Sequence, residues 1–142
     1  MFKVTLQTEI NVQTRGQGLV RIDDAIEKAL GSLLKGNEAG LVHLHILHTS
    51  ASLLIQENSD PTAKADLEEF FNRLAPEGQN WHRHTVEGPD DTVSHLKASL
   101  LPVSLTLPLT SGRLKLGTWQ GVYLFEHRHA PHSRKIFVTA MF

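Results

Sequence analysis

Cysteine is absent from this sequence of 142 residues. Its absence excludes disulfides, thiolate zinc sites, iron–sulfur clusters and a cysteine nucleophile. No apolar run approaches the ~20 residues of a membrane span, and the first ten residues lack the ~7–15-residue apolar stretch of a signal peptide. We therefore expect a cytoplasmic protein with no membrane partner. Its chemistry has to come from histidine, carboxylate and hydroxyl groups.

An excess of charge of one sign is also lacking. Fourteen basic and 15 acidic residues give a formal net charge of −1. No long-range field would then attract nucleic acid, so we expect no nucleic-acid partner. The length fits one domain over residues 1–142, because domains cluster near ~100–150 residues. What stands out is nine histidines, whose neutral side chains bind metals.

The hydropathy pattern predicts strands and helices in separate blocks. Helices are expected after Asp23-Asp24, from Asp60 to about Leu74, and after Asp90-Asp91, because these aspartates are typical N-terminal caps. Strands are expected over 2–10, 40–48, 52–56, 103–109, 113–116, 118–125 and 134–141. Since helices do not follow every strand, the pattern favours an α+β fold with a mostly antiparallel sheet and two or three helices.

Two further segments carry structural predictions. Apolar residues at helical spacing predict a buried stripe on the second helix. These residues are Ala65, Leu67, Phe70, Phe71 and Leu74. The segment 75–89 is polar and long for a connecting loop, which is typical of a functional loop.

Three histidines lie at the ends of separate elements. His48 ends an apolar strand face, His84 lies in the long loop, and His95 follows Asp91 by one helical turn. Three neutral imidazoles can form an open metal site with one position left for water or a phosphate oxygen. Asp91 either orients His95 from outside the ligand set or only caps its helix. Unrelated surface or core histidines remain the alternative.

Two other segments offer binding groups. Within 117–120, Thr118 and Gln120 offer hydrogen bonds and Trp119 offers a stacking face, although packing of Trp119 in the core is the alternative. The basic residues of 127–135 are suited to anionic groups or form a solvated loop. The serines that follow His48 do not indicate a serine nucleophile, because no GxSxG pattern surrounds them.

Three longer blocks resemble a known family. HTSASLLIQENSDPT (48–62), EGPDDTVSHLK (87–97) and GTWQGVYLFEHR (117–128) are similar to the signature blocks of the YjbQ-like family, also described as secondary thiamine-phosphate synthases. The resemblance implies a small barrel-like sheet and a homotrimer. It also implies a reaction that joins an aminopyrimidine methyl diphosphate to a thiazole phosphate, giving thiamine phosphate and pyrophosphate. The partner would therefore be a small phosphorylated metabolite.

The resemblance also assigns residues to roles. Metal binding, to zinc or magnesium, would fall to His48, His84 and His95, with Asp91 behind them. Catalysis would involve the same histidines and Glu57. Ligand binding would fall to Thr49, Ser50, Asn58, Lys97, Gly117, Thr118, Trp119, Gln120 and Arg134.

Within this set, Lys97 and Arg134 would face the leaving diphosphate, and Trp119 would shelter the pyrimidine beside the histidine site. Two alternatives remain: a metal-dependent phosphate-ester hydrolase with Glu57 as general base, and a non-catalytic trimeric module that binds a metabolite. The strongly apolar segment 136–142 is expected to be covered, because an exposed apolar edge strand would aggregate.

Overall fold

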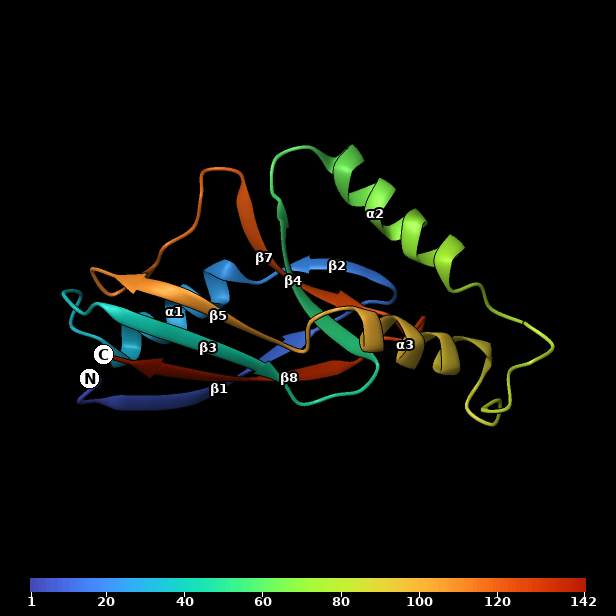
Figure 1. The fold of residues 1–142 in the computed structure, drawn as a ribbon, viewed down its shortest axis with the longest axis horizontal. Helices are drawn as coiled ribbons and strands as arrows, with labels where there is room; N and C mark the ends of the chain where they lie inside the picture. The colour runs from blue at the N-terminus through green and yellow to red at the C-terminus, as the bar shows by residue number, and fades with distance from the viewer.

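The computed structural model describes residues 1–142 as eight strands and three helices (Figure 1). Along the chain these are β1 (Thr5–Gln13), β2 (Gly18–Arg21), α1 (Asp23–Leu33), β3 (Gly40–Ile46), β4 (Ala51–Glu57), α2 (Pro61–Leu74), α3 (Pro89–Leu100), β5 (Ser104–Thr110), β6 (Arg113–Leu114), β7 (Gln120–Glu126) and β8 (Ser133–Met141). Every strand pair is antiparallel. The predicted α+β fold is confirmed.

The strands form two sheets that together curl into a half-barrel. The larger sheet has the order β1-β8-β3-β5-β6 and the smaller one β2-β7-β4. Their apolar faces share one core with α1, in which Ile26 and Leu30 of the helix meet Leu44 of β3 and Leu124 of β7. All four side chains are fully buried. Burial of this kind contributes roughly 1.5–3 kcal/mol for each large aliphatic side chain.

The apolar C-terminal strand is covered, as the sequence predicts. β8 lies between β1 and β3 and pairs with both, so its backbone leaves no open edge. The two chain ends meet beside it, because the backbone amides of Lys3 and Val4 both donate to the Phe142 carbonyl at 2.9 Å. Both ends lie at the side of the molecule remote from α3 (Figure 1).

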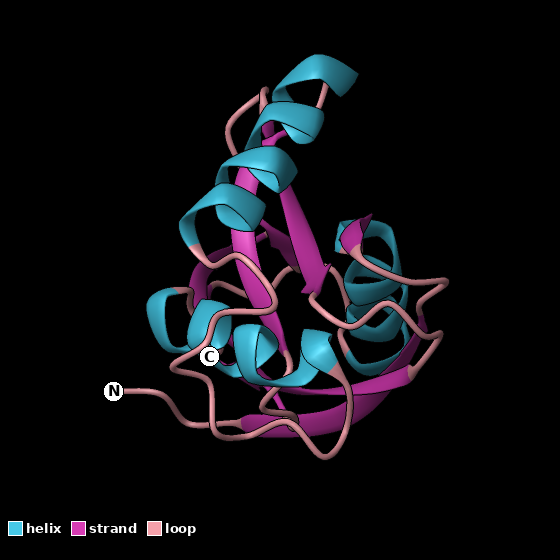
Figure 2. Ribbon diagram, turned by 90° about the vertical axis from the view of Figure 1, so that its right-hand side faces the viewer, coloured by secondary structure: helices cyan, strands magenta, loops and turns pink.

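α2 begins where the sequence predicts, but fewer of its apolar side chains are buried than predicted. The Asp60 side chain accepts a hydrogen bond from the Thr62 amide at 2.9 Å, which caps the helix. Only Phe71 of the expected stripe is buried, whereas Phe70 and Leu74 are 56% and 52% exposed. The apolar side chains of α2 pack on the small second core around Phe125, while α1 lies apart from it on the molecule (Figure 2). The predicted buried stripe is therefore wrong for most of its residues.

α3 begins at Pro89, after a glycine that the turn requires. Gly88 has a φ of +102°, a conformation that favours glycine. Asp90 and Asp91 lie inside the first turn and not at the cap, and both are buried. None of the three helices is both long enough and apolar enough to cross a membrane. The first turn of α3 thus carries two buried carboxylates, of which Asp91 reaches His84 in the loop before the helix and Asp90 reaches Arg128.

Candidate metal centre and adjoining cavity

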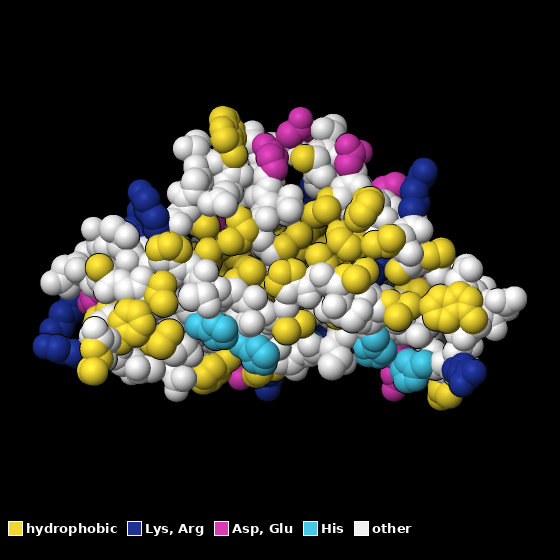
Figure 3. Space-filling model, in the orientation of Figure 1, with side chains coloured by type: hydrophobic (Ala, Val, Ile, Leu, Met, Phe, Trp, Pro, Cys, Tyr) yellow, Lys and Arg dark blue, Asp and Glu magenta, His cyan; other side chains and the backbone are white.

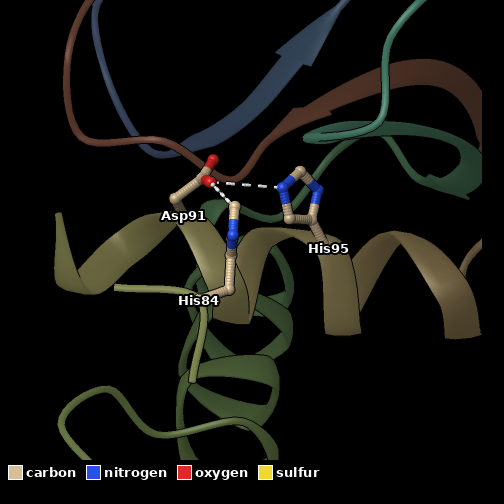
Figure 4. A group of neighbouring side chains, drawn as sticks. All are labelled: His84, Asp91 and His95. Carbon is tan, nitrogen blue, oxygen red and sulfur yellow. Dashed lines mark hydrogen bonds and ion pairs between the residues drawn. The ribbon is translucent and has the colours of Figure 1, made fainter. Parts of the chain in front are cut away.

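Two imidazoles and one carboxylate converge at the start of α3 (Figure 4). Asp91 Oδ2 lies 2.5 Å from His84 Nε2 and 3.3 Å from His95 Nε2. One potential ligand atom from each residue lies within 4.8 Å of the other two. Asp91 and His95 share one face of α3 because they are four residues apart, and the loop before the helix brings His84 to the same place. The structure thus joins two of the three predicted histidines.

The hydrogen bonds of His95 fit a cation at this point. Its Nδ1 lies 2.9 Å from the Thr49 carbonyl oxygen, which only accepts, so Nδ1 carries a proton. In the neutral ring, the lone pair of Nε2 then faces the carboxylate of Asp91. Two electron-rich atoms 3.3 Å apart need a proton or a metal ion between them. In a tetrahedral zinc site neighbouring ligand atoms lie about 3.4 Å apart, which the 3.3 Å between His95 Nε2 and Asp91 Oδ2 matches. His84 Nε2, at 2.5 Å from Asp91 Oδ2, would move back from the carboxylate to join the same ion.

Asp91 takes a different place from the predicted one. The sequence places it behind the ligands, whereas its Oδ2 lies among them and only its Oδ1 faces away, toward Arg128 Nη1 at 2.8 Å. Burial acts to raise the pKa of Asp91. The hydrogen bond from His84 and the positive charge of Arg128 outweigh that effect and hold the pKa of Asp91 below its usual range. The carboxylate is therefore ionised and suited to a cation.

His48 lies outside this group. Its Nε2 accepts a hydrogen bond from the Lys135 amide at 2.7 Å, so its proton is on Nδ1. Burial, followed by the charge of Arg134, lowers the pKa of His48 and favours the neutral ring. His48 instead lines a cavity of about 740 Å³ together with His95 and Thr49. The rest of the lining consists of His45, Ile46, Leu47, Ala98, Ser99 and Val103.

The predicted phosphate-binding cations do not line this cavity. Arg134 is buried and donates from Nε to Glu126 Oε1 and from Nη2 to Ser50 Oγ, at 2.8 and 2.9 Å. Lys97 is 1% exposed and donates to Asn72 Oδ1 at 2.8 Å. Its burial lowers its pKa. Both side chains are held by partners inside the fold, and Ser50 serves as one of those partners.

Glu57 and Asn58 lie at the opposite end of β4 from Thr49. Glu57 Oε2 accepts hydrogen bonds from the amides of Ser59 and Asp60 at 3.0 and 2.8 Å. Seven residues of an extended strand span roughly 20 Å. Within one subunit, Glu57 is therefore separated from the histidine site, as the two ends of β4 in Figure 1 show.

The segment 117–120 lies beside Glu57 and Asn58. Asn58 Nδ2 donates to the carbonyl oxygens of Thr118 and Gln120, each at 3.1 Å. Gln120 Oε1 accepts from the Gly117 amide at 2.8 Å. Trp119 is 63% exposed, so the alternative that it packs in the core is wrong. These bonds hold the loop in one shape and present the indole ring to solvent.

Sequence reasoning misses the role of the segment after β7. His127 is fully buried, and its Nε2 lies 2.9 Å from Ser52 Oγ. Arg128 forms ion pairs with both Asp90 and Asp91. Neither side chain belongs to a solvated basic loop. Charge alone marks this segment in the sequence, and the contact to α3, 37 residues away, leaves no local pattern.

Comparisons with known proteins identify one family and several relatives that are similar to this chain. The model of the family described as UPF0047 protein YjbQ-like matches residues 8–142. UPF0047 protein YjbQ of Salmonella typhimurium is 47% identical over 133 residues, which cover 94% of this chain and 95% of that protein. UPF0047 protein sll1880 of Synechocystis is 42% identical over 127 residues, covering 89% and 85% of the two chains.

Solved structures show the same fold. A conserved hypothetical protein from Thermus thermophilus aligns with a TM-score of 0.83 and 36% identity, covering 95% of this chain and 99% of that chain. A YjbQ/UPF0047-family protein from Clostridium acetobutylicum aligns with a TM-score of 0.81 and 31% identity, again covering 95% and 99%. The names of these relatives state no activity, so the reaction has to be argued from the site.

Proposed function

Because the chain belongs to the UPF0047 protein YjbQ-like family, we propose that it is a divalent-metal-dependent enzyme acting on a phosphorylated small molecule. One observation carries the proposal. His95 Nε2 and Asp91 Oδ2 face each other beside His84 Nε2, in a tautomer fixed by Thr49. Three protein ligands with an open position are typical of catalytic metal sites, whereas structural zinc sites have four.

The specific reaction that we propose is the formation of thiamine phosphate, which the family resemblance implies. The bond between the pyrimidine methylene carbon and the diphosphate oxygen breaks, and its electron pair leaves with the diphosphate. The thiazole nitrogen then supplies the electron pair of the new carbon–nitrogen bond. A bound divalent ion would neutralise charge on the diphosphate. His84, Asp91 and His95 would hold that ion.

The cavity supplies groups for the remainder of the substrate. His48 and Thr49 line it next to His95, and the Nδ1–H of His48 and the hydroxyl of Thr49 are donors suited to phosphate oxygens. The apolar part of the cavity lining consists of Ile46, Leu47, Ala98 and Val103. This lining suits an uncharged ring such as a pyrimidine, because no lysine, arginine or carboxylate belongs to it.

We further propose that the chain forms a homotrimer in which a neighbour completes the site. Glu57 and Trp119 lie at the far end of β4, so only the copies on another subunit would reach the cavity. Exposed apolar side chains support contact between subunits, among them Phe70, Leu74 and Leu100. Figure 3 shows a wide apolar surface on this face of the molecule, above two groups of histidines. A hydrolase that used Glu57 as general base would need the same arrangement.

Metal analysis combined with single substitutions tests the metal site. Purified protein stripped with a chelator should rebind one zinc ion per chain, measured by calorimetry. His84→Ala, Asp91→Asn and His95→Ala should each weaken binding by at least 100-fold, because each removes one of three ligands. His129→Ala is the matched control, since His129 pairs with Glu77 outside the group. Equal zinc affinity in the His95→Ala and wild-type proteins would refute the site.

Product analysis then tests the reaction. The zinc- or magnesium-loaded protein should convert the aminopyrimidine methyl diphosphate and the thiazole phosphate to thiamine phosphate, with equimolar pyrophosphate. Phosphate release from simple esters without thiamine phosphate would favour the hydrolase. Ligand-dependent thermal stabilisation without turnover, with either metal, would favour the non-catalytic module. Light scattering of the same sample reports the oligomeric state, and a monomer with full activity would refute the shared site.

A further inference from the structure

Arg128 links the segment after β7 to the start of α3. Its Nε donates to Asp90 Oδ2 at 3.0 Å and its Nη1 to Asp91 Oδ1 at 2.8 Å. Its Nη2 donates to the carbonyl oxygen of Glu87 at 2.9 Å. The amide of His129 also donates to Asp90 Oδ2, at 2.8 Å. The guanidinium group thus spans three acceptors at the N-terminal end of α3.

These contacts leave Arg128 little freedom for another role. Its side chain is 18% exposed and that of Asp91 is 2% exposed, so the pair is largely shielded from water. Each of its three side-chain nitrogens already donates to an oxygen of the protein. Arg128 also does not line the cavity beside His95. A direct contact with a substrate phosphate would require it to break these bonds.

The two carboxylate oxygens of Asp91 consequently have different partners. Oδ1 accepts from Arg128, while Oδ2 faces His84 and His95. We propose that Arg128 is a positioning residue that holds Asp91 Oδ1 and so restricts Asp91 to a one-oxygen contact with the metal ion. This inference rests on the proposed metal site. By occupying Oδ1, Arg128 keeps one coordination position open for a substrate oxygen.

The positive charge of Arg128 weakens the binding of a metal cation, whereas its orientation of Asp91 strengthens that binding. A guanidinium next to the ligand set repels a divalent cation, whereas its hydrogen bond fixes the carboxylate that binds the cation. Replacement by lysine keeps the charge and loses the planar fork, and replacement by glutamine loses both. The two variants therefore separate positioning from repulsion.

Binding of Co²⁺ to the chelator-stripped full-length protein provides the test, with affinity from calorimetry and coordination from visible absorption. Arg128→Lys should bind Co²⁺ 10- to 100-fold more weakly than wild type, because the orienting hydrogen bonds are lost. Its absorption should also fall by at least half, since a carboxylate free to bind through both oxygens raises the coordination number. Arg128→Gln should bind more tightly than Arg128→Lys. Arg113→Lys, at an ion pair with Glu27, is the matched control.

The outcomes separate this inference from the proposed function. Wild-type protein that binds no Co²⁺ overturns both. If the wild type binds Co²⁺ and Arg128→Lys shows the same affinity and spectrum, the positioning role alone is overturned. Tighter binding of Co²⁺ by Arg128→Gln than by wild type would show a pure charge effect and would also overturn the positioning role. If circular dichroism shows that Arg128→Lys is unfolded, Asp90→Asn loosens the other end of the fork. It should show the same changes, and a wild-type spectrum and affinity would overturn the inference.

Discussion

Replacing His127 with glutamine tests whether this imidazole remains neutral inside the fold. His127 is fully buried, its Nε2 lies 2.9 Å from Ser52 Oγ, and its Nδ1 has no hydrogen-bond partner. Burial, followed by the charge of Lys97, lowers the pKa of His127 to about 3. A histidine in the unfolded chain titrates near ~6.5. Between these two pH values the unfolded chain therefore binds one proton more than the native chain.

The extra proton sets both the sign and the size of the effect. The free energy of unfolding should be highest above pH ~6.5 and should fall as the pH drops from there toward ~3, because protons favour the unfolded chain. The slope of the free energy of unfolding against pH approaches ~1.4 kcal/mol per pH unit. Because of His127, this free energy should fall by about 2 kcal/mol between pH 7 and pH 5. His127→Gln lacks the titrating group and should lose about 2 kcal/mol less over this interval.

Urea denaturation at pH 7, 6 and 5 in the presence of a chelator measures the difference. The comparison concerns the change with pH in each protein, so a constant difference in stability between the variants does not affect it. His45→Gln, which removes an exposed imidazole, is the matched control and should follow the wild type. Parallel curves for wild type and His127→Gln would show that the pKa of His127 is the same in the native and unfolded chains and would refute the reasoning.

Three further substitutions test separate parts of the structure. Glu126→Gln should lower the free energy of unfolding by roughly 3–5 kcal/mol in urea denaturation, because it leaves the buried guanidinium of Arg134 without its counter-charge. A loss below ~1 kcal/mol would contradict this. Asp60→Ala should cost ~1 kcal/mol by removing the cap of α2, and an unchanged melting temperature would count against that cap. Trp119→Ala should change stability by under ~1 kcal/mol, since the ring is exposed, while weakening ligand binding in calorimetry.

Local patterns account for the parts of the fold that the sequence predicts correctly. The Asp60-Pro61 pair identifies the start of α2, because the cap and the first helical position are set by adjacent residues. Alternation likewise identifies β3, in which Val42 is fully buried, and a strongly apolar run identifies β8, in which Val138 is fully buried. Periodicity fails on α2, because it describes which face is apolar and not how much of that face another part of the chain covers.

The site shows the same division between local and long-range information. The four-residue spacing of Asp91 and His95 places both on one helix face, so their proximity follows from the sequence. The position of His48 does not follow, because it depends on the Lys135 amide, 87 residues away. The role of Arg128 is hidden for the same reason. Long-range hydrogen bonds decide which histidines and carboxylates meet, and they leave no spacing to detect.

The meeting of the two chain ends beside β8 has a practical consequence for experiments on this protein. Lys3 and Val4 are tied to Phe142 at the side of the molecule remote from α3. An affinity tag, a fluorophore or a surface anchor attached at either end would emerge away from His84, Asp91 and His95. A linker of a few residues would also suffice to join the ends covalently, because chain ends that lie close together tolerate circular permutation.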